Sequence, residues 1–245
     1  MATALPLAVE ARLTRAGQHV VALQTMLEAY AARPPWRVSR RPSEPPRVIE
    51  RAELVEQPPI EAAMLVSDAV HQARAALDNL VNALRNGGPA PKVCFPVHAD
   101  AAEFDRHARD ELNGVPDWAR DAIRDLQPFS MTSHWKVAGE PLAYLHELAR
   151  VDRHRVPPLH AGVVWPEYAT GNAASGIEPR VNPAGGWAEW EYVPSEVGRT
   201  AFEVKIHFGP EGGQPPDVEV VDWTSYLVRS TAYAIELILR SAAMR

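Results

Sequence analysis

One helical stretch of the sequence carries a line of polar residues whose types could do chemistry. Ser67, His71, Arg74 and Asp78 are spaced four, three and four residues apart, so in a helix they stack on one narrow strip. An imidazole moves protons near neutral pH, and a guanidinium holds a phosphate or a carboxylate. The strip borders the apolar face of its helix, where an unpaired arginine or aspartate is costly. It therefore predicts a partner element that carries complementary charges.

A second charged cluster, Asp-Arg-His-Arg at residues 152–155, follows the core positions of another predicted helix, Pro141 to His154. Leu145 and Leu148 mark the core face of that helix, and continuing by threes and fours places Asp152 and Arg155 on the same face. The cluster is therefore a candidate for the partner of the polar strip.

The two clusters suggest specific ion pairs. We expect Arg74 to pair with Asp152, and Asp78 to pair with Arg155 or His154, because planar guanidinium–carboxylate pairs tolerate burial best. The same residues fit two interpretations: a network that fixes how two helices dock, or a working site.

Hydrophobic periodicity predicts the elements that position these residues. Helices are predicted over Pro6 to Arg33, Ile60 to Arg85, Ala101 to Leu112, Pro116 to Leu126, Pro141 to His154 and Trp223 to Ala243. Strands are predicted for Val48 to Val55, Leu159 to Trp165, Trp187 to Val193, Ala201 to Phe208 and Val218 to Val221, and the segment Arg33 to Arg51 is predicted to be extended or a loop. The fold class is therefore α+β, a predominantly helical bundle with a small antiparallel β-sheet inserted before the C-terminal helix.

We expect a single domain over residues 1–245. The bundle is assigned to 1–33, 59–155 and 223–245, an extended arm to 34–58, and a β-rich insertion to 156–222.

Composition narrows the function classes. The 245 residues contain 25 Lys+Arg and 31 Asp+Glu, a formal net charge of -6, so any nucleic-acid contact is expected to be local. The single cysteine, Cys94, excludes an internal disulfide framework and a multi-thiolate metal site within one chain. We expect no membrane span and a cytoplasmic protein.

Metal-donor residues gather in the same region of the sequence: His71, His146, Glu147, Asp152 and His154. Neither a His-Glu-x-x-His nor a Glu-x-x-His spacing occurs, and the neighbouring arginines would repel a cation. Glycine-rich phosphate loops and dinucleotide fingerprints are also absent from the sequence. We therefore expect no metal and no cofactor.

Four short motifs, in this order, resemble a widespread group of uncharacterised bacterial proteins. They are Asp68-Ala69-Val70-His71-Gln72-Ala73-Arg74-Ala75-Ala76-Leu77-Asp78, Phe95-Pro96-Val97, Gln127-Pro128-Phe129 and Asp152-Arg153-His154-Arg155. In those relatives the first motif looks like GDxxHNLRSALDH and the last like DKHR, and the resemblance covers roughly residues 60–160. The helical part is also distantly similar to HEPN domains, which are compact helical bundles that often act as metal-independent ribonucleases through an Arg-x4-6-His motif.

The HEPN resemblance implies a site and an assembly. Arg74 would stabilise charge on the phosphorane, and His154, or His71, would move the proton of the 2′-hydroxyl. This chain departs from the motif. With four residues between the two positions, Arg74 is followed by Asn79 where the motif has histidine, and an asparagine cannot act as an acid or base near neutral pH. HEPN nucleases generally build their site across a dimer, so the resemblance also implies a homodimer.

The arginine-rich arm and the polar network leave two functions open. In the first, the chain is a HEPN-like RNA-processing or defence protein, and the arm binds a phosphate backbone while Trp36 stacks on a base. In the second, it is a non-catalytic module that binds a small anion or a protein, the network is architectural, and the arm is a solvated loop that covers a sheet edge. A phosphate or carboxylate suits Arg74 and Arg155 equally well.

Overall fold

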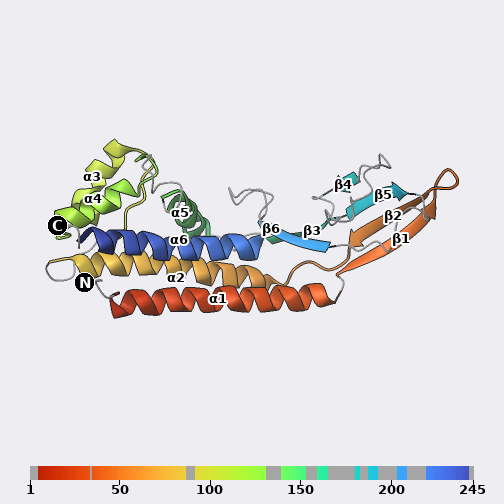
Figure 1. The fold of residues 1–245 in the computed structure, drawn as a ribbon, viewed down its shortest axis with the longest axis horizontal. Helices are drawn as coiled ribbons and strands as arrows, with labels where there is room; N and C mark the ends of the chain where they lie inside the picture. The colour runs from red at the N-terminus through yellow and green to blue at the C-terminus, as the bar shows by residue number, and fades with distance from the viewer. Residues whose placement is uncertain are drawn as a thin grey trace.

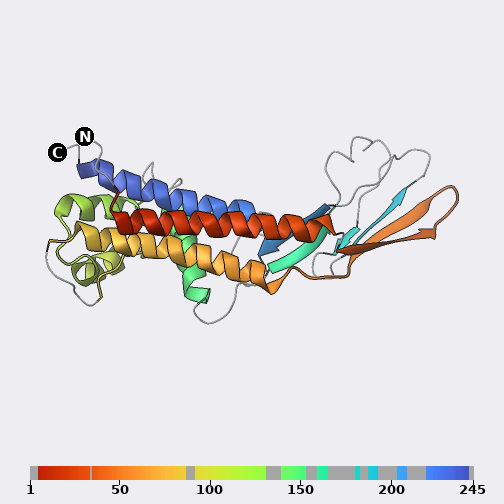
Figure 2. The same ribbon diagram turned by 90° about the horizontal axis from the view of Figure 1, so that it is seen from below.

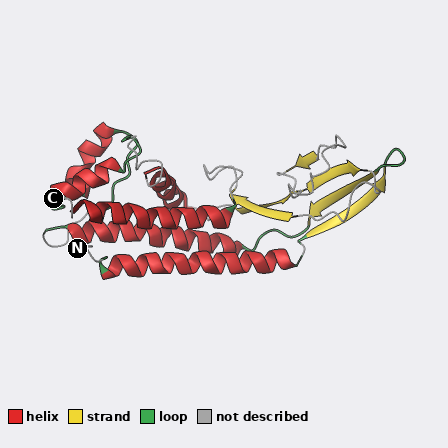
Figure 3. Ribbon diagram, viewed as in Figure 1, coloured by secondary structure: helices red, strands yellow, loops and turns green. Residues whose placement is uncertain are grey.

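The computed structural model describes residues 5–33, 35–86, 92–130, 139–152, 159–164, 180–182, 187–192, 203–208 and 219–242. Its elements, in chain order, are α1 (Leu7–Ala32), β1 (Trp36–Pro42), β2 (Val48–Leu54), α2 (Ile60–Leu84), α3 (Ala101–Glu111), α4 (Asp117–Asp125), α5 (Glu140–Asp152), β3 (Leu159–Val164), β4 (Arg180–Asn182), β5 (Trp187–Tyr192), β6 (Glu203–Phe208) and α6 (Val220–Ser241). The fold is α+β and predominantly helical, as the sequence predicts (Figure 3).

Three long helices, α1, α2 and α6, lie side by side and form the body of the molecule (Figures 1 and 2). The central helix is α2, which packs against α1, α5 and α6. Small residues let these neighbours approach it closely, because Ala62, Ala69, Ala73 and Ala76 are fully buried. The helix therefore buries residues on more than one face, and Gln72 on its α1 side accepts a hydrogen bond from Arg12.

The inner face of α1 follows a regular seven-residue pattern. Its inward positions, spaced alternately four and three residues apart, are Val9, Leu13, Ala16, Val20, Leu23, Leu27 and Tyr30. This spacing is that of a coiled-coil seam, in which one narrow stripe packs on the partner helix. The opposite face stays in solvent, where Val21 is 64% exposed.

Prolines and an aspartate set where several helices begin. Pro6, Pro59 and Pro116 precede α1, α2 and α4 with φ near -58°, a backbone angle that suits a helix start. Asp100 caps α3, because its side chain accepts a hydrogen bond from the backbone N–H of Glu103 at 2.7 Å.

The sheet combines strands from two distant parts of the chain. Its order is β1-β2-β5-β4, with all neighbours antiparallel, and β3 and β6 form a separate antiparallel pair. The first two strands come from the predicted arm, so the four-stranded sheet is not built from the 156–222 insertion alone. Two further corrections concern β4, which the sequence did not predict, and Val220, which begins α6 and does not belong to a strand.

The sheet extends the bundle lengthwise. It projects from the end where α1 finishes and α2 begins, while α3 and α4 cover the opposite end (Figure 1). In the described part of the chain, no helix combines the length and apolar character needed to cross a membrane.

Candidate functional site

Arg74 lies on the face of α2 that meets the loop after residue 92. One of its terminal nitrogens, Nη2, donates a short hydrogen bond to the backbone carbonyl of Phe95 and lies 3.2 Å from Oδ1 of Asp78, one turn further along the helix. The Arg74 side chain is only 12% exposed. The guanidinium is therefore largely desolvated, and its charge is matched within the same helix.

Asp78 binds the other backbone group of Phe95. Its Oδ1 accepts a hydrogen bond from the backbone N–H of Phe95 at 2.9 Å. Arg74 and Asp78 thus satisfy both backbone groups of one loop residue, while the Phe95 side chain is fully buried in the core. Because a buried backbone group without a partner is costly, this double contact fixes the loop against α2.

Gln127 holds the next residues of the same loop. Its side-chain amide donates to the carbonyl of Pro96 at 3.0 Å, and its oxygen accepts from the N–H of His98 at 3.0 Å. Gln127 is 1% exposed. Three of the four sequence motifs, those at 68–78, 95–97 and 127–129, therefore meet at this loop.

One terminal nitrogen of the Arg74 guanidinium makes no hydrogen bond. Its Nη1 is buried and has no hydrogen-bond partner, a property that it shares, in the described part of the chain, with the indole nitrogen of Trp223. The Trp223 ring packs between Tyr144, 5.2 Å away, and Tyr226, 5.3 Å away. These aromatic contacts place Trp223 in the packing between α5 and α6.

The remaining residues of the expected site are only partly placed. His71 is exposed on α2, one turn before Arg74. Helix α5 packs against α2, as the paired strips predict, and it ends at Asp152. The side chain of Asp152, and all of His154 and Arg155, lie outside the described residues, so their predicted pairs with Arg74 and Asp78 stay predictions.

The thiol of Cys94 lies beside this network. Burial, followed by the nearby carboxylates of Glu111 and Asp78, raises the pKa of Cys94 to about 11. A raised pKa keeps the thiol protonated near neutral pH and makes it a poor nucleophile. Cys94 therefore acts here as a small hydrophobic residue.

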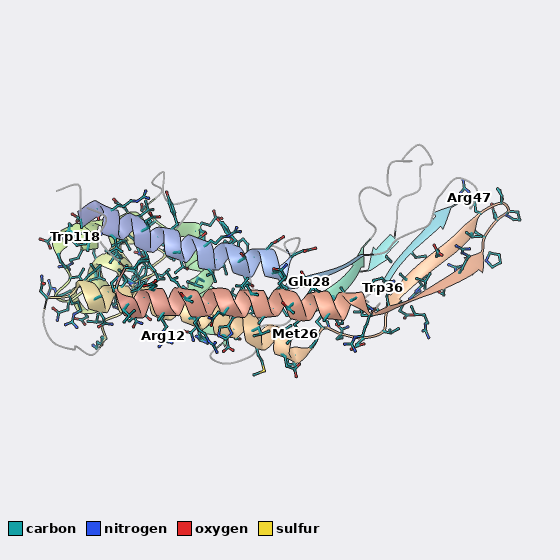
Figure 4. The ribbon with its side chains drawn as sticks, turned by 60° about the horizontal axis from the view of Figure 1, so that its bottom comes forward. Arg12, Met26, Glu28, Trp36, Arg47 and Trp118 are labelled. Atoms are coloured by element: carbon teal, nitrogen blue, oxygen red, sulfur yellow. The ribbon has the colours of Figure 1, made fainter. Side chains whose placement is uncertain are left out.

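Trp36 lies far from the Arg74 network. It begins β1, where α1 gives way to the sheet (Figure 4). Arg74 lies 14 residues into α2 from the sheet end of that helix, which corresponds to about 21 Å along its axis. The structure therefore does not bring Trp36 and Arg74 into one site.

The arginines of the predicted arm are matched by glutamates of the sheet. Arg40 lies 3.1 Å from Glu50, its direct neighbour on β2, and Arg41 lies 3.1 Å from Glu189 on β5. Arg37 is 3.6 Å from Glu53, again opposite it across the ladder. The sequence alone does not indicate these glutamates, because it does not specify the strand register that brings them beside the arginines.

The described residues contain no group of three or more histidines, cysteines, aspartates or glutamates arranged to hold a metal ion. His98, which precedes α3, forms a hydrogen bond of 2.8 Å with Glu111, the last residue of that helix, and its ring stacks on His107 at 5.4 Å. Both contacts fasten the 92–100 segment to α3.

Comparisons of the chain with protein-family models, with curated proteins and with solved structures found no match. Only the geometry of the chain itself therefore bears on its function.

Proposed function

We propose that this chain is a non-catalytic protein-binding module, in which the Arg74 network is architectural and the β1–β2 hairpin contacts the partner. The observation that carries the proposal is a partition of charge. Residues 36–54, which form the hairpin, hold five arginines and three glutamates, a net charge of +2, while the whole chain has -6, which leaves -8 for the rest. The basic part is also the part that projects furthest from the bundle (Figure 1). Such a separation steers an acidic surface toward the hairpin.

The environment of Arg74 supports a structural role for this residue. A catalytic arginine presents several N–H groups to the charge that develops in the transition state. Arg74 instead gives Nη2 to Phe95 and Asp78 within one chain, and its side chain is 12% exposed. Its contacts are those of a residue that holds a loop.

The sheet favours a protein partner over a nucleic acid. Glutamates alternate with the arginines, and Glu50, Glu53 and Glu189 each lie within 4 Å of an arginine. These carboxylates would repel a phosphate backbone that lies across the sheet face, since such binding depends on cation–phosphate contacts. A partner that approaches from the outer strand meets arginines before it meets glutamates.

Fluorescently labelled poly-L-glutamate and a mixed RNA pool of equal length test the proposal. We expect poly-L-glutamate to bind, with affinity at least fivefold weaker in Arg37→Gln/Arg41→Gln. The matched control, Arg12→Gln/Arg15→Gln on α1, removes the same charge away from the hairpin and should change affinity less than twofold. Equal losses in the two variants, or tighter binding of RNA, would overturn the proposal.

Catalysis is tested directly with the same RNA pool in EDTA. We expect no cleavage by the wild-type protein. Cleavage that is lost in a folded His154→Ala variant would instead support a metal-independent nuclease.

A further inference from the structure

We propose that the hairpin binds by strand addition: an extended acidic segment of the partner pairs with the outer edge of β1. The inference rests on the proposed function and specifies how its surface works. Strand β1 is one edge of the four-stranded sheet, and the described strands place no neighbour on its outer side. Six of its seven residues are exposed.

The hydrogen-bond register shows which backbone groups of β1 point away from β2. Val55 donates its N–H to the carbonyl of Pro35 at 2.8 Å, and Ser43 donates to the carbonyl of Arg47 at 3.1 Å. Both contacts continue the register of the β1–β2 ladder, in which Trp36 lies opposite Leu54 and Pro42 lies opposite Val48. The hydrogen-bonded pairs are therefore those of the odd-numbered β1 residues, because bonded and non-bonded pairs alternate in an antiparallel ladder.

The even-numbered residues of β1 consequently aim their backbone groups away from β2. Trp36, Val38 and Arg40 each present an N–H and a carbonyl to the outer side, and Pro42 presents a carbonyl alone. Because a proline has no N–H to donate, Pro42 ends the available ladder near the hairpin tip. The outer edge thus offers an added strand the N–H groups of Trp36 and Val38, which lie about 7 Å apart along the strand.

The side chains of β1 define the chemistry of the added strand. Arg37, Arg40 and Arg41 are 72%, 58% and 62% exposed, and the strand contains no acidic residue. Arg37 and Arg41 lie on one face of the sheet, and Val38, which is 43% exposed, lies on the other. An added strand with acidic residues on the first face would place them beside Arg37 and Arg41, and an apolar residue on the second face would lie beside Val38, each about 5 Å away.

The same charges argue against a second copy as the occupant. An antiparallel pairing that overlaps the whole of β1 with itself places Arg37 of each copy opposite Arg41 of the other. Like charges directly opposite each other destabilise a ladder. Arginines and a proline on an edge strand are also devices that prevent self-pairing.

The probe for this inference is a labelled peptide, Thr-Glu-Val-Glu-Val-Glu-Thr, with blocked ends, whose binding is followed by fluorescence anisotropy. The decisive variant is Val38→Pro, which removes an outward N–H but no bond of the β1–β2 ladder, so the hairpin is expected to keep its fold. We expect at least a tenfold loss of affinity in Val38→Pro and less than a twofold change in the control Val38→Thr. A peptide with lysine in place of glutamate should bind at least tenfold more weakly.

Unchanged peptide affinity in Val38→Pro would overturn strand addition, while the poly-L-glutamate experiment would still report on the proposed function. Amide exchange of the wild-type protein gives an independent readout that needs no variant. Without peptide, the amides of Trp36 and Val38 should exchange quickly and those of Arg37, Ser39 and Arg41 slowly; with peptide, all five should be slow. Protection of Trp36 and Val38 without peptide, at rising protein concentration, would assign the edge to a second copy and overturn the proposal.

Discussion

At the scale of single residues, side chains provide hydrogen bonds to a loop backbone that neighbouring strands provide in a sheet. Phe95 has its N–H bound by Asp78 and its carbonyl bound by Arg74, so two side chains of one helix replace the neighbours that a strand would have. Gln127 continues the arrangement at Pro96 and His98. A loop of irregular backbone can therefore run through the interior without losing its hydrogen bonds.

Removing Arg74 should cost the fold a large part of its stability. In Arg74→Ala the carbonyl of Phe95 loses its donor and Asp78 loses its counter-charge, which we expect to lower the free energy of unfolding by about 2–4 kcal/mol. Urea unfolding measures the change. Arg12→Ala, which removes an exposed hydrogen bond to Gln72, should change it by less than about 0.5 kcal/mol. Similar stabilities of the two variants would contradict the architectural role.

Cys94 should react slowly in the folded protein. Since its pKa is raised from 9.0 to about 11, the thiolate fraction at pH 8 falls about a hundredfold, and alkylation by iodoacetamide should slow by a similar factor relative to the urea-unfolded chain. The same shift makes the folded state retain a proton that the unfolded state releases, so stability should fall as the pH rises from about 9 to about 11. Equal alkylation rates in the folded and unfolded chains would contradict the raised pKa.

At the scale of elements, α1 is held by a single stripe of side chains. Its inward residues recur at coiled-coil spacing, while its other faces meet solvent, so neighbouring positions in the sequence differ sharply in what they contribute. Tyr30 closes the stripe at the sheet end, where its hydroxyl donates to the carbonyl of Glu56 at 2.6 Å. That contact joins the end of α1 to the segment that leads from β2 into α2.

Two substitutions on α1, two residues apart, test the stripe. Leu23 is fully buried, so Leu23→Ala should destabilise the fold by about 3 kcal/mol through lost burial and a cavity. Val21 is 64% exposed, and Val21→Ala should change stability by less than about 0.5 kcal/mol. Chemical denaturation of both variants checks the difference, and comparable losses would mean that α1 packs on another face.

Two glycines give opposite predictions for the same substitution. At Gly17, within α1, an added Cβ meets nothing within 4 Å, so Gly17→Ala should stabilise the protein by about 1 kcal/mol through helix propensity. Gly114 has a φ of +79°, and its Cβ would lie 3.0 Å from the carbonyl oxygen of Asn86, so Gly114→Ala should destabilise it by about 1–2 kcal/mol. Thermal unfolding of the two variants should shift in opposite directions, and a shift of the same sign would refute the pair.

Helices were predictable from sequence to within a few residues, whereas strand partners were not. The 3.6-residue periodicity of residues 60–84 lies within one segment, so the sequence alone indicates α2. The pairing of β2 with β5 joins residues 48–53 with 187–192, and no local pattern specifies that contact. Val220 and Val221 have a strand-like composition, but they belong to the first turn of α6, because packing on α2 overrides a short local preference.

The sequence predicts that the polar strip needs partners, but it does not indicate the backbone partner that the structure shows. Burial of an arginine and an aspartate demands counter-charges or hydrogen bonds, and the sequence predicts this. The partner that the structure shows is the backbone of Phe95, and a backbone group has no sequence signature. The glutamates beside the arm arginines were hidden for a similar reason, because they depend on register across three strands.

At the scale of the whole molecule, the sheet and the bundle are arranged end to end. Helix α1 is about 39 Å long and β1 adds about 23 Å in the same general direction, so the pair spans about 60 Å (Figure 2). A compact chain of this length has a radius of gyration of about 18 Å, which corresponds to a sphere about 46 Å across. The molecule is therefore elongated.

Small-angle X-ray scattering of the monomer should reflect this shape. We expect a radius of gyration above about 20 Å, because the hairpin projects past the bundle. A size-exclusion step before the measurement separates any dimer, whose larger radius would otherwise mimic the effect. A monomer value near 18 Å would mean that the sheet folds back onto the helices.

The first helix begins, and the last helix ends, at the end of the bundle opposite the sheet (Figure 1). A tether attached beyond either helix is therefore about 39 Å, the length of α1, from the start of the hairpin. When the protein is immobilised on a sensor surface through such a tether, the bundle stands between the surface and Trp36, and the hairpin faces the solution. Attachment at either end of the chain thus leaves the hairpin accessible to a partner in solution.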